Sequence, residues 1–341
     1  MSATKHTEAV GVLAKVETTY NSAASLSTST DGVQIIKPRP DLTIGYAYDG
    51  ARTAQNGGFG GLQRQTPTGR TLSGTIRCEA KGHGTAYTSS AVTVPHIHPL
   101  LRAAGFDATV STGGGAEKWD FTPTAGTGSL ASNTLRFYTR GEQFDAAGCY
   151  TGLKINIDGA GIPVWEFPFV GTLATAVADT TLPSITYHSY SVIPPVAAGT
   201  SFTWGNFTSG IVRSATFDLG RTIENPRVNI NASAAHAGYQ PGLRAPVLDV
   251  LVEATTLQGA PYHASTAIDP YQLAANATSG LAFSMTVGGT QYNRWKLIFG
   301  QAQLMAPPEL VDEGSVGLWR LKLAPYTTGA TAVDDLTIRF D

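Results

Sequence analysis

The sequence has few charged side chains and almost no imbalance between the two signs. Asp, Glu, Lys and Arg make up 14% of the 341 residues, against about 25% in an average soluble protein. The 23 basic and 25 acidic residues leave a net charge of −2, which excludes a polybasic nucleic-acid coat and a polyacidic tail. So few charges predict that something other than water covers much of the surface.

Long apolar runs and cysteines are scarce too. No apolar run approaches the ~18 residues of a membrane-spanning helix, and the first residues lack the apolar core of a secretory signal. We therefore expect no membrane partner and folding in a cytoplasm. The two cysteines, Cys78 and Cys149, are too few for a disulfide framework, and we expect two buried, reduced thiols.

Motifs that carry chemistry are missing. The chain has no Gly-x-Ser-x-Gly, His-Glu-x-x-His or Cys-x-x-Cys segment, the patterns of common hydrolase, zinc and redox sites. His96 and His98 could share one side of a strand, but the other histidines show no ligand spacing. The glycine runs 57–61 and 113–115 do not open a helix after a buried strand, so they are not phosphate loops. We expect no catalytic residue, no cofactor and no metal, and hence no enzyme.

Alternating apolar and polar residues dominate what is present, and this pattern predicts β-strands with one buried face. Turn glycines follow several of these segments at 158–161, 287–290 and 313–315, as hairpins require. Helix signals are confined to 94–106, which ends at Gly105, and to 268–276, where Asp269 precedes Pro270. The sequence predicts an all-β fold with one or two short helices. The clearest strand segments are 71–80, 152–158, 228–231, 247–253 and 318–323.

The two halves of the chain carry a weak internal repeat. Short matches recur in one order, at spacings of 169, 174 and 148 residues. The fall in spacing locates about 26 extra residues in the first half, which we interpret as loop over 107–130. The matched pairs are Asp49–Thr53 with Asp218–Thr222, Arg77–Ala80 with Leu251–Ala254, and Arg140–Phe144 with Gly288–Tyr292.

A series of segments along the chain resembles one protein family. It begins with Lys-Val-Glu-Thr-Thr-Tyr-Asn at 15–21 and continues with Pro-Leu-Leu-Arg-Ala-Ala-Gly-Phe at 99–106. Taken together, these segments resemble the tail tube proteins of long-tailed bacteriophages, in a duplicated form. The further segments that carry the likeness are Gly148–Ile155, Val164–Gly171, Ser214–Gly220 and Ala282–Gly288.

The resemblance implies two tandem β-barrel or sandwich domains that assemble into rings stacked around a DNA channel. The partners implied are other copies of this chain, in trimeric pseudo-hexameric or hexameric rings, and tail proteins such as the tape measure, terminator and distal tail proteins. Double-stranded DNA would pass through the lumen without sequence-specific binding. The implied location is the virion, after assembly in the cytoplasm of the bacterial host.

The repeat and the resemblance together divide the chain into an N-terminal arm at 1–30, a first domain at 31–175, a linker at 176–208 and a second domain at 209–341. The long loops 52–69 and 222–242 lie at matching places, and long loops in compact domains usually have a function. We expect these loops and the arm to form subunit contacts. The expected contact residues are Lys15, Glu17, Tyr20, Arg52, Phe59, Leu62, Arg64, Arg221, Val228, Ile230 and Tyr239.

Two alternatives stay open at this point. Another tail ring protein, such as a distal tail protein, would share the same features. A carbohydrate-binding or carbohydrate-cleaving β-sandwich is the alternative from a different class, because the chain has five tryptophans. Tryptophans exposed on one face would favour sugar binding, and tryptophans buried in both halves would favour the tube.

Overall fold

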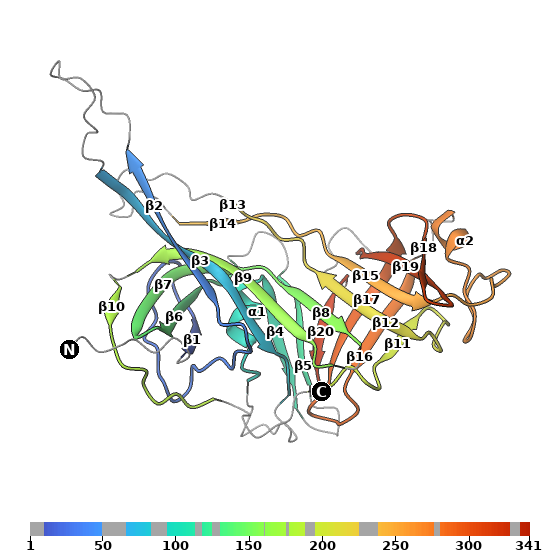
Figure 1. Cartoon of the computed structure of the whole chain (residues 1–341), viewed down its shortest axis with the longest axis horizontal. Helices are drawn as coiled ribbons and strands as arrows, with labels where there is room; N and C mark the ends of the chain where they lie inside the picture. The colour runs from blue at the N-terminus through green and yellow to red at the C-terminus, as the bar shows by residue number, and fades with distance from the viewer. Residues whose placement is uncertain are drawn as a thin grey trace, which may run out of the picture.

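The protein is nearly all-β in the computed structural model, which confirms the predicted fold class (Figure 1). Only two short helices occur in the described residues, α1 (His98–Ala103) and α2 (Pro270–Ala275). Neither helix is long and apolar enough to cross a membrane. The structure describes residues 10–49, 66–82, 94–112, 118–124, 130–159, 161–174, 177–187, 195–224, 238–275, 280–327 and 335–341.

The first half builds an antiparallel sheet in the order β1-β6-β7-β9-β3-β2. Strand β8 lies beside β9, at the opposite end of that strand from β7. These strands are β1 (Val10–Val16), β2 (Asp41–Asp49), β3 (Thr66–Glu79), β6 (Asn133–Thr139), β7 (Glu142–Thr151), β8 (Lys154–Asp158) and β9 (Val164–Leu173).

The second half has the same strand order, β11-β16-β17-β19-β15-β12, with β18 beside β19. In both halves the helix lies between the third and fourth of these strands along the chain. The strands are β11 (Ser201–Trp204), β12 (Val212–Asp218), β15 (Val247–Glu253), β16 (Leu281–Val287), β17 (Trp295–Leu304), β18 (Glu309–Glu313) and β19 (Val316–Pro325).

The strand registers correspond as well as the strand order. One bulge interrupts β6–β7 between Asn133 and Leu135, and one interrupts β16–β17 between Leu281 and Phe283. These positions are 148 residues apart, the spacing found from the sequence for this hairpin. Because a register slip of one residue would reverse the buried face, matching registers place matching side chains on matching faces. The halves therefore correspond in strand order and register, while two tandem domains and their boundaries stay a prediction.

One of the three spacings found from the sequence, 169 residues, differs from the spacing of the corresponding strands in the structure. Asp41 faces Thr75 on β3, and Thr216 faces Asp249 on β15. With β3 and β15 matched at 174 residues, β2 and β12 therefore match at 175 residues rather than at 169. The match of Asp49 with Asp218 is wrong because β2 continues beyond the point that corresponds to the end of β12.

The two halves form one continuous sheet that does not close into a barrel. Strand β8 pairs with β12, so the first half continues into the second instead of closing on itself. A second connection is made by β4 (Phe106–Ser111), β5 (Lys118–Pro123) and the C-terminal strand β20 (Thr337–Phe340). Strand β5 pairs with β4 and with β20, and β20 also pairs with β17.

The interpretation of 107–130 as a loop was therefore wrong. Trp119 and Phe121 alternate with polar residues and are buried in β5. Glycine-rich segments lie on both sides of these few alternating residues, and they give the region 107–130 the composition of a loop. The strand is stabilised by pairing with β20, a partner more than 200 residues away that no local pattern reveals.

The predicted arm and linker both contribute to the sheet. Strand β1 lies within 1–30 and pairs with β6. Within 176–208, β10 (Ala178–Asp179) pairs with β7, and β11 pairs with β16 as part of the second half. These segments are thus part of the fold, not only connections or extensions.

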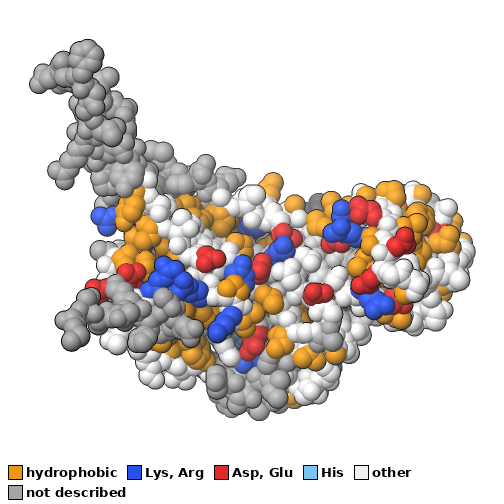
Figure 2. All heavy atoms as spheres, viewed as in Figure 1, with side chains coloured by type: hydrophobic (Ala, Val, Ile, Leu, Met, Phe, Trp, Pro, Cys, Tyr) orange, Lys and Arg blue, Asp and Glu red, His pale blue; other side chains and the backbone are white. Residues whose placement is uncertain are grey.

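The β2–β3 hairpin projects from the body of the molecule, at the upper left of Figure 1. The two strands stay paired from Asp41 and Thr75 to Asp49 and Thr66, so the predicted loop 52–69 is strand from Thr66 onward. Figure 2 shows apolar side chains at the described base of this hairpin, where Tyr46 is exposed. The second predicted loop also starts as a ribbon, because β13 (Ile223–Glu224) pairs with β14 (Gln240–Pro241).

The C-terminus of α1 and the N-terminus of α2 lie where the sequence signals predict them. Gly105 follows α1 with a φ of +89°, the left-handed conformation that ends helices at glycine. Asp269 caps α2, since its Oδ1 accepts a hydrogen bond from the backbone N–H of Gln272 at 3.0 Å.

The core is rich in aromatic side chains, and all five tryptophans are buried. At the junction of the halves, Trp165 of β9 meets Trp295 of β17 edge to face, with ring centroids 5.0 Å apart. Phe340 of β20 packs beside Trp165 and faces Trp295 across the strand pair. The contact between the halves is therefore a packed core, not a flexible linker.

Candidate subunit interface

The structure describes five of the eleven predicted contact residues. Lys15, Glu17 and Tyr20 lie in and after β1, Arg221 follows β12, and Tyr239 precedes β14. The others lie outside the described residues, and their role in subunit contacts stays a prediction. These are Arg52, Phe59, Leu62, Arg64, Val228 and Ile230.

Glu17 is buried and its carboxylate accepts four hydrogen bonds from the same chain. The hydroxyls of Ser132 and Thr134 donate at 2.6 and 2.8 Å. The backbone N–H groups of Asn21 and Gly148 donate at 2.9 and 2.8 Å. The Glu17 carboxylate thus fixes the chain after β1 against β6 and β7, and its predicted role in a subunit contact stays a prediction.

Tyr20 and Tyr239 are brought together although they lie 219 residues apart in the sequence. The backbone N–H of Tyr239 donates to the Tyr20 hydroxyl at 2.6 Å, and that hydroxyl lies 3.2 Å from the Tyr239 carbonyl oxygen. The Tyr20 ring stacks on Tyr150. Burial raises the pKa of both Tyr20 and Tyr239 to about 12. This contact joins the N-terminal segment to the base of the second predicted loop within one subunit.

Arg221 also makes its contact within the chain. Its Nη1 donates to the carbonyl oxygen of Ala104 at 2.8 Å, at the C-terminal end of α1, where a positive charge is favourable. Burial lowers the pKa of Arg221, and the charge of Arg244 adds to this effect. A side chain at Gly105 would collide with the Arg221 guanidinium. Arg221 therefore holds the second half against α1 of the first half.

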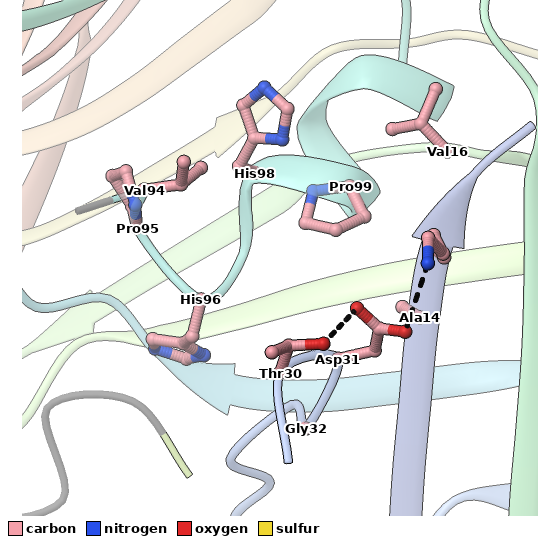
Figure 3. Close-up of a pocket in the computed structure, with 11 residues that line it drawn as sticks. Ala14, Val16, Thr30, Asp31, Gly32, Val94, Pro95, His96, His98 and Pro99 are labelled. Carbon is pink, nitrogen blue, oxygen red and sulfur yellow. Dashed lines mark hydrogen bonds and ion pairs between the residues drawn. The ribbon is translucent and has the colours of Figure 1, made fainter. Parts of the chain in front are cut away.

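Lys15 lies at the rim of a hollow of about 540 Å³ between β1 and the segment that leads into α1. Figure 3 shows His96 and His98 on this segment, with Asp31 on the facing side of the hollow. The Lys15 Nζ lies 3.6 Å from Asp31, and the side chain of Lys15 is partly exposed. His96 Nε2 is 2.8 Å from the carbonyl oxygen of Glu79, so the two histidines have different surroundings and do not converge.

His98 is expected to make the stability of the protein depend on pH. Its ring lies against Trp119 and Phe121, and burial, with a contribution from Arg102, lowers its pKa from 6.5 to about 4. The unfolded chain binds this proton more readily, so stability is lost as the pH falls from about 6.5 to about 4. The loss is about 2–3 kcal/mol, at 1.36 kcal/mol per pKa unit reduced for partial exposure.

Replacing His98 by a side chain that cannot be protonated isolates this effect. Urea unfolding of the His98→Phe variant and of the unaltered chain, between pH 7 and pH 4.5, measures it. The unaltered chain should lose stability more steeply than the variant. Parallel pH profiles would show that His98 does not carry this dependence.

The chemical groups of the described residues offer no assembled reactive site. No cluster of three or more His, Cys, Asp or Glu side chains suited to a metal occurs in that part of the chain. Cys78 and Cys149 are free and buried, and burial raises the pKa of both thiols, which makes them unreactive. The buried tryptophans form no exposed platform of the kind that sugar rings stack on.

Two strand edges offer a different kind of site, one made of backbone groups. Among the described residues, β2 pairs only with β3, and β18 pairs only with β19. An exposed edge carries free N–H and C=O groups and is a template for a further strand. Figure 1 shows β2 at one end of the molecule and β18 at the other.

The edge at β18 interrupts an apolar row that is complete in the first half. There, Trp165 of β9 faces Ile155 of β8, which faces Phe217 of β12, and all three are buried. In the second half Trp319 of β19 is buried and faces Leu310 of β18, which is 67% exposed. Sequence reasoning missed Leu310, because the alternation of a short strand does not reveal which edge of the strand stays open.

Comparisons of the chain with protein-family models and with curated proteins find no match, so the assignment of a function depends on this geometry and on the sequence pattern.

Proposed function

We propose that this protein is a structural virion component that assembles into stacked rings and forms the tail tube of a long-tailed bacteriophage. The tube is the channel through which DNA passes into the host. Its subunits are copies of this chain, and its ends meet other tail proteins. The protein performs no catalysis and needs no cofactor.

The observation that carries this proposal is the join between the two halves. Two units of the same strand order meet edge to edge, through β8 and β12, in one antiparallel sheet. A ring is built from the same kind of step, repeated between units related by rotation. A chain with two such units gives a three-fold ring with pseudo-six-fold symmetry.

Composition and shape fit the same function. Few charges are needed on a subunit whose faces contact neighbours in the ring and in the adjacent rings. The near-neutral balance suits a lumen that DNA crosses without binding tightly. The projecting β2–β3 hairpin (Figure 1) has the reach to contact a neighbouring subunit.

Electron microscopy of the purified protein at rising concentration tests this function. We expect rings and tubes, with sedimentation velocity showing particles far larger than the 35.7 kDa subunit. A protein that stays monomeric at every concentration would contradict the proposal. Isolated rings that never stack would instead indicate another tail ring protein, such as a distal tail protein.

A further inference from the structure

We propose that β18 of one subunit pairs antiparallel with β2 of the next subunit, in the register in which β8 pairs with β12 within the chain. This inference rests on the proposed function and specifies its partner surface as a second copy of the chain. It uses the join between the two halves as the template for the join between subunits.

The two free edges are the structural equivalents of the two joined ones. Strand β18 occupies beside β19 the place that β8 occupies beside β9. Strand β2 occupies beside β3 the place that β12 occupies beside β15. Because β8 and β12 form a continuous sheet, the same two types of edge are complementary when they come from different copies.

The equivalence extends to single residues. Lys154 faces Glu166 and Glu309 faces Arg320, which makes Leu310 the counterpart of Ile155. Leu42 faces Gly74 on β3 as Phe217 faces Leu248 on β15, which makes Leu42 the counterpart of Phe217. Since Ile155 faces Phe217, the inferred register places Leu310 opposite Leu42 of the neighbour.

This pairing covers the apolar side chain that the fold leaves exposed. The row that ends at Leu310 would continue into Leu42 of the neighbour, as the first-half row continues into Phe217. Leu42 is only partly buried and packs against the core at its inner side. Pairing of the two strands would therefore remove the apolar area of Leu310 and Leu42 from water. It would also pair the backbone N–H and C=O groups of the two edges.

The charges beside the two edges are complementary. Asp312 and Glu313 end β18, and Lys37 and Arg39 precede β2. In an antiparallel pair in which Val311 faces Asp41, the acidic end of β18 lies beside the basic segment before β2. Opposite charges at the rim favour this orientation and suppress pairing between two copies of β18, which would bring like charges together.

The geometry predicts closed assemblies rather than dimers. The two surfaces differ, so the contact is head-to-tail, and head-to-tail contacts form rings when the rotation closes. The join within the chain has a second connection through β5 and β20. The join between subunits lacks a counterpart of this connection among the described strands, so we expect it to separate first on dilution or in denaturant.

Disulfide cross-linking tests the register directly. A chain carrying both Leu42→Cys and Leu310→Cys should form, on mild oxidation, a ladder of covalent oligomers that ends at the ring size. Each single variant should give no ladder. The pair Thr43→Cys and Leu310→Cys should fail too, because a slip of one residue turns one side chain to the opposite face. The native thiols are buried and should stay unreacted.

A second variant makes the outcome independent of disulfide geometry. Leu310→Asp should fold as the unaltered chain does, because the side chain is exposed, and should sediment only as a monomer. Leu257→Asp, which alters an exposed leucine outside both strands, is the matched control and should assemble normally.

The outcomes separate this inference from the proposed function. Rings or tubes that form without the cross-linked ladder, or from Leu310→Asp, would overturn the β18–β2 pairing and leave the tube function standing. A chain that neither assembles nor cross-links at any concentration would overturn both. A ladder specific to Leu42 and Leu310, together with a monomeric Leu310→Asp variant, would support the pairing.

Discussion

The Glu17→Ala variant is expected to lose about 3–5 kcal/mol of stability, a large part of the total for a domain. The alanine would leave the buried backbone N–H of Gly148 and the partly buried backbone N–H of Asn21 without their acceptor. Each unsatisfied buried donor costs about 1–3 kcal/mol. The hydroxyls of Ser132 and Thr134 lose their carboxylate acceptor as well.

Urea unfolding followed by circular dichroism measures this loss, and two variants serve as controls. Asp107→Ala removes a half-exposed carboxylate whose ion pair with Arg102 lies at the surface, and should cost less than about 1 kcal/mol. Glu17→Gln keeps the shape of the side chain but turns an amide N–H₂ group toward a hydrogen-bond donor. Its loss of stability should fall between those of Glu17→Ala and Asp107→Ala. If Glu17→Ala were no less stable than Asp107→Ala, the buried cluster would not have the role assigned to it.

The Trp295→Ala variant is expected to lose a similar amount, about 3–5 kcal/mol, by opening a cavity in the junction between the halves. Trp295 is fully buried, packs on Trp165 edge to face and faces Phe340 across the strand pair. Trp165 of the first half loses its ring contact with β17, and Phe340 of β20 loses the side chain that faces it. Coupling between the halves should therefore weaken together with stability.

Unfolding followed by two signals distinguishes this from a local effect. Far-ultraviolet circular dichroism and tryptophan fluorescence should give coincident transitions in the unaltered chain and separate transitions in Trp295→Ala. Trp295→Phe keeps an aromatic ring and should lose about half as much stability. Coincident transitions with a loss below about 1 kcal/mol in Trp295→Ala would show that the junction does not couple the halves.

Local patterns were sufficient to predict much of the fold. The alternation in β3, β8, β15 and β19, the glycine that ends α1 and the aspartate that caps α2 are properties of a few neighbouring residues, and all appear in the structure. The β5–β20 pairing could not be predicted in this way. Its partners are distant in the sequence, and only the assembled sheet brings them together.

The candidate site was harder to predict, because sequence marks a residue as special without saying whether its partner lies in the same chain. Glu17, Tyr20 and Tyr239 were singled out as contact residues, and the structure uses them to join distant parts of one subunit. Leu42 and Leu310 look like ordinary strand residues. They become candidates only when the strand order shows which edges remain open.

End-on electron microscopy of the assembled protein tests the central claim most directly. If each chain supplies two equivalent units joined edge to edge, averaged end views should show a closed ring around an open lumen, with six similar lobes formed by three chains. Particles without a lumen would contradict the account. Rings in which one of the two lobes from each chain differs in shape from the other would contradict it too.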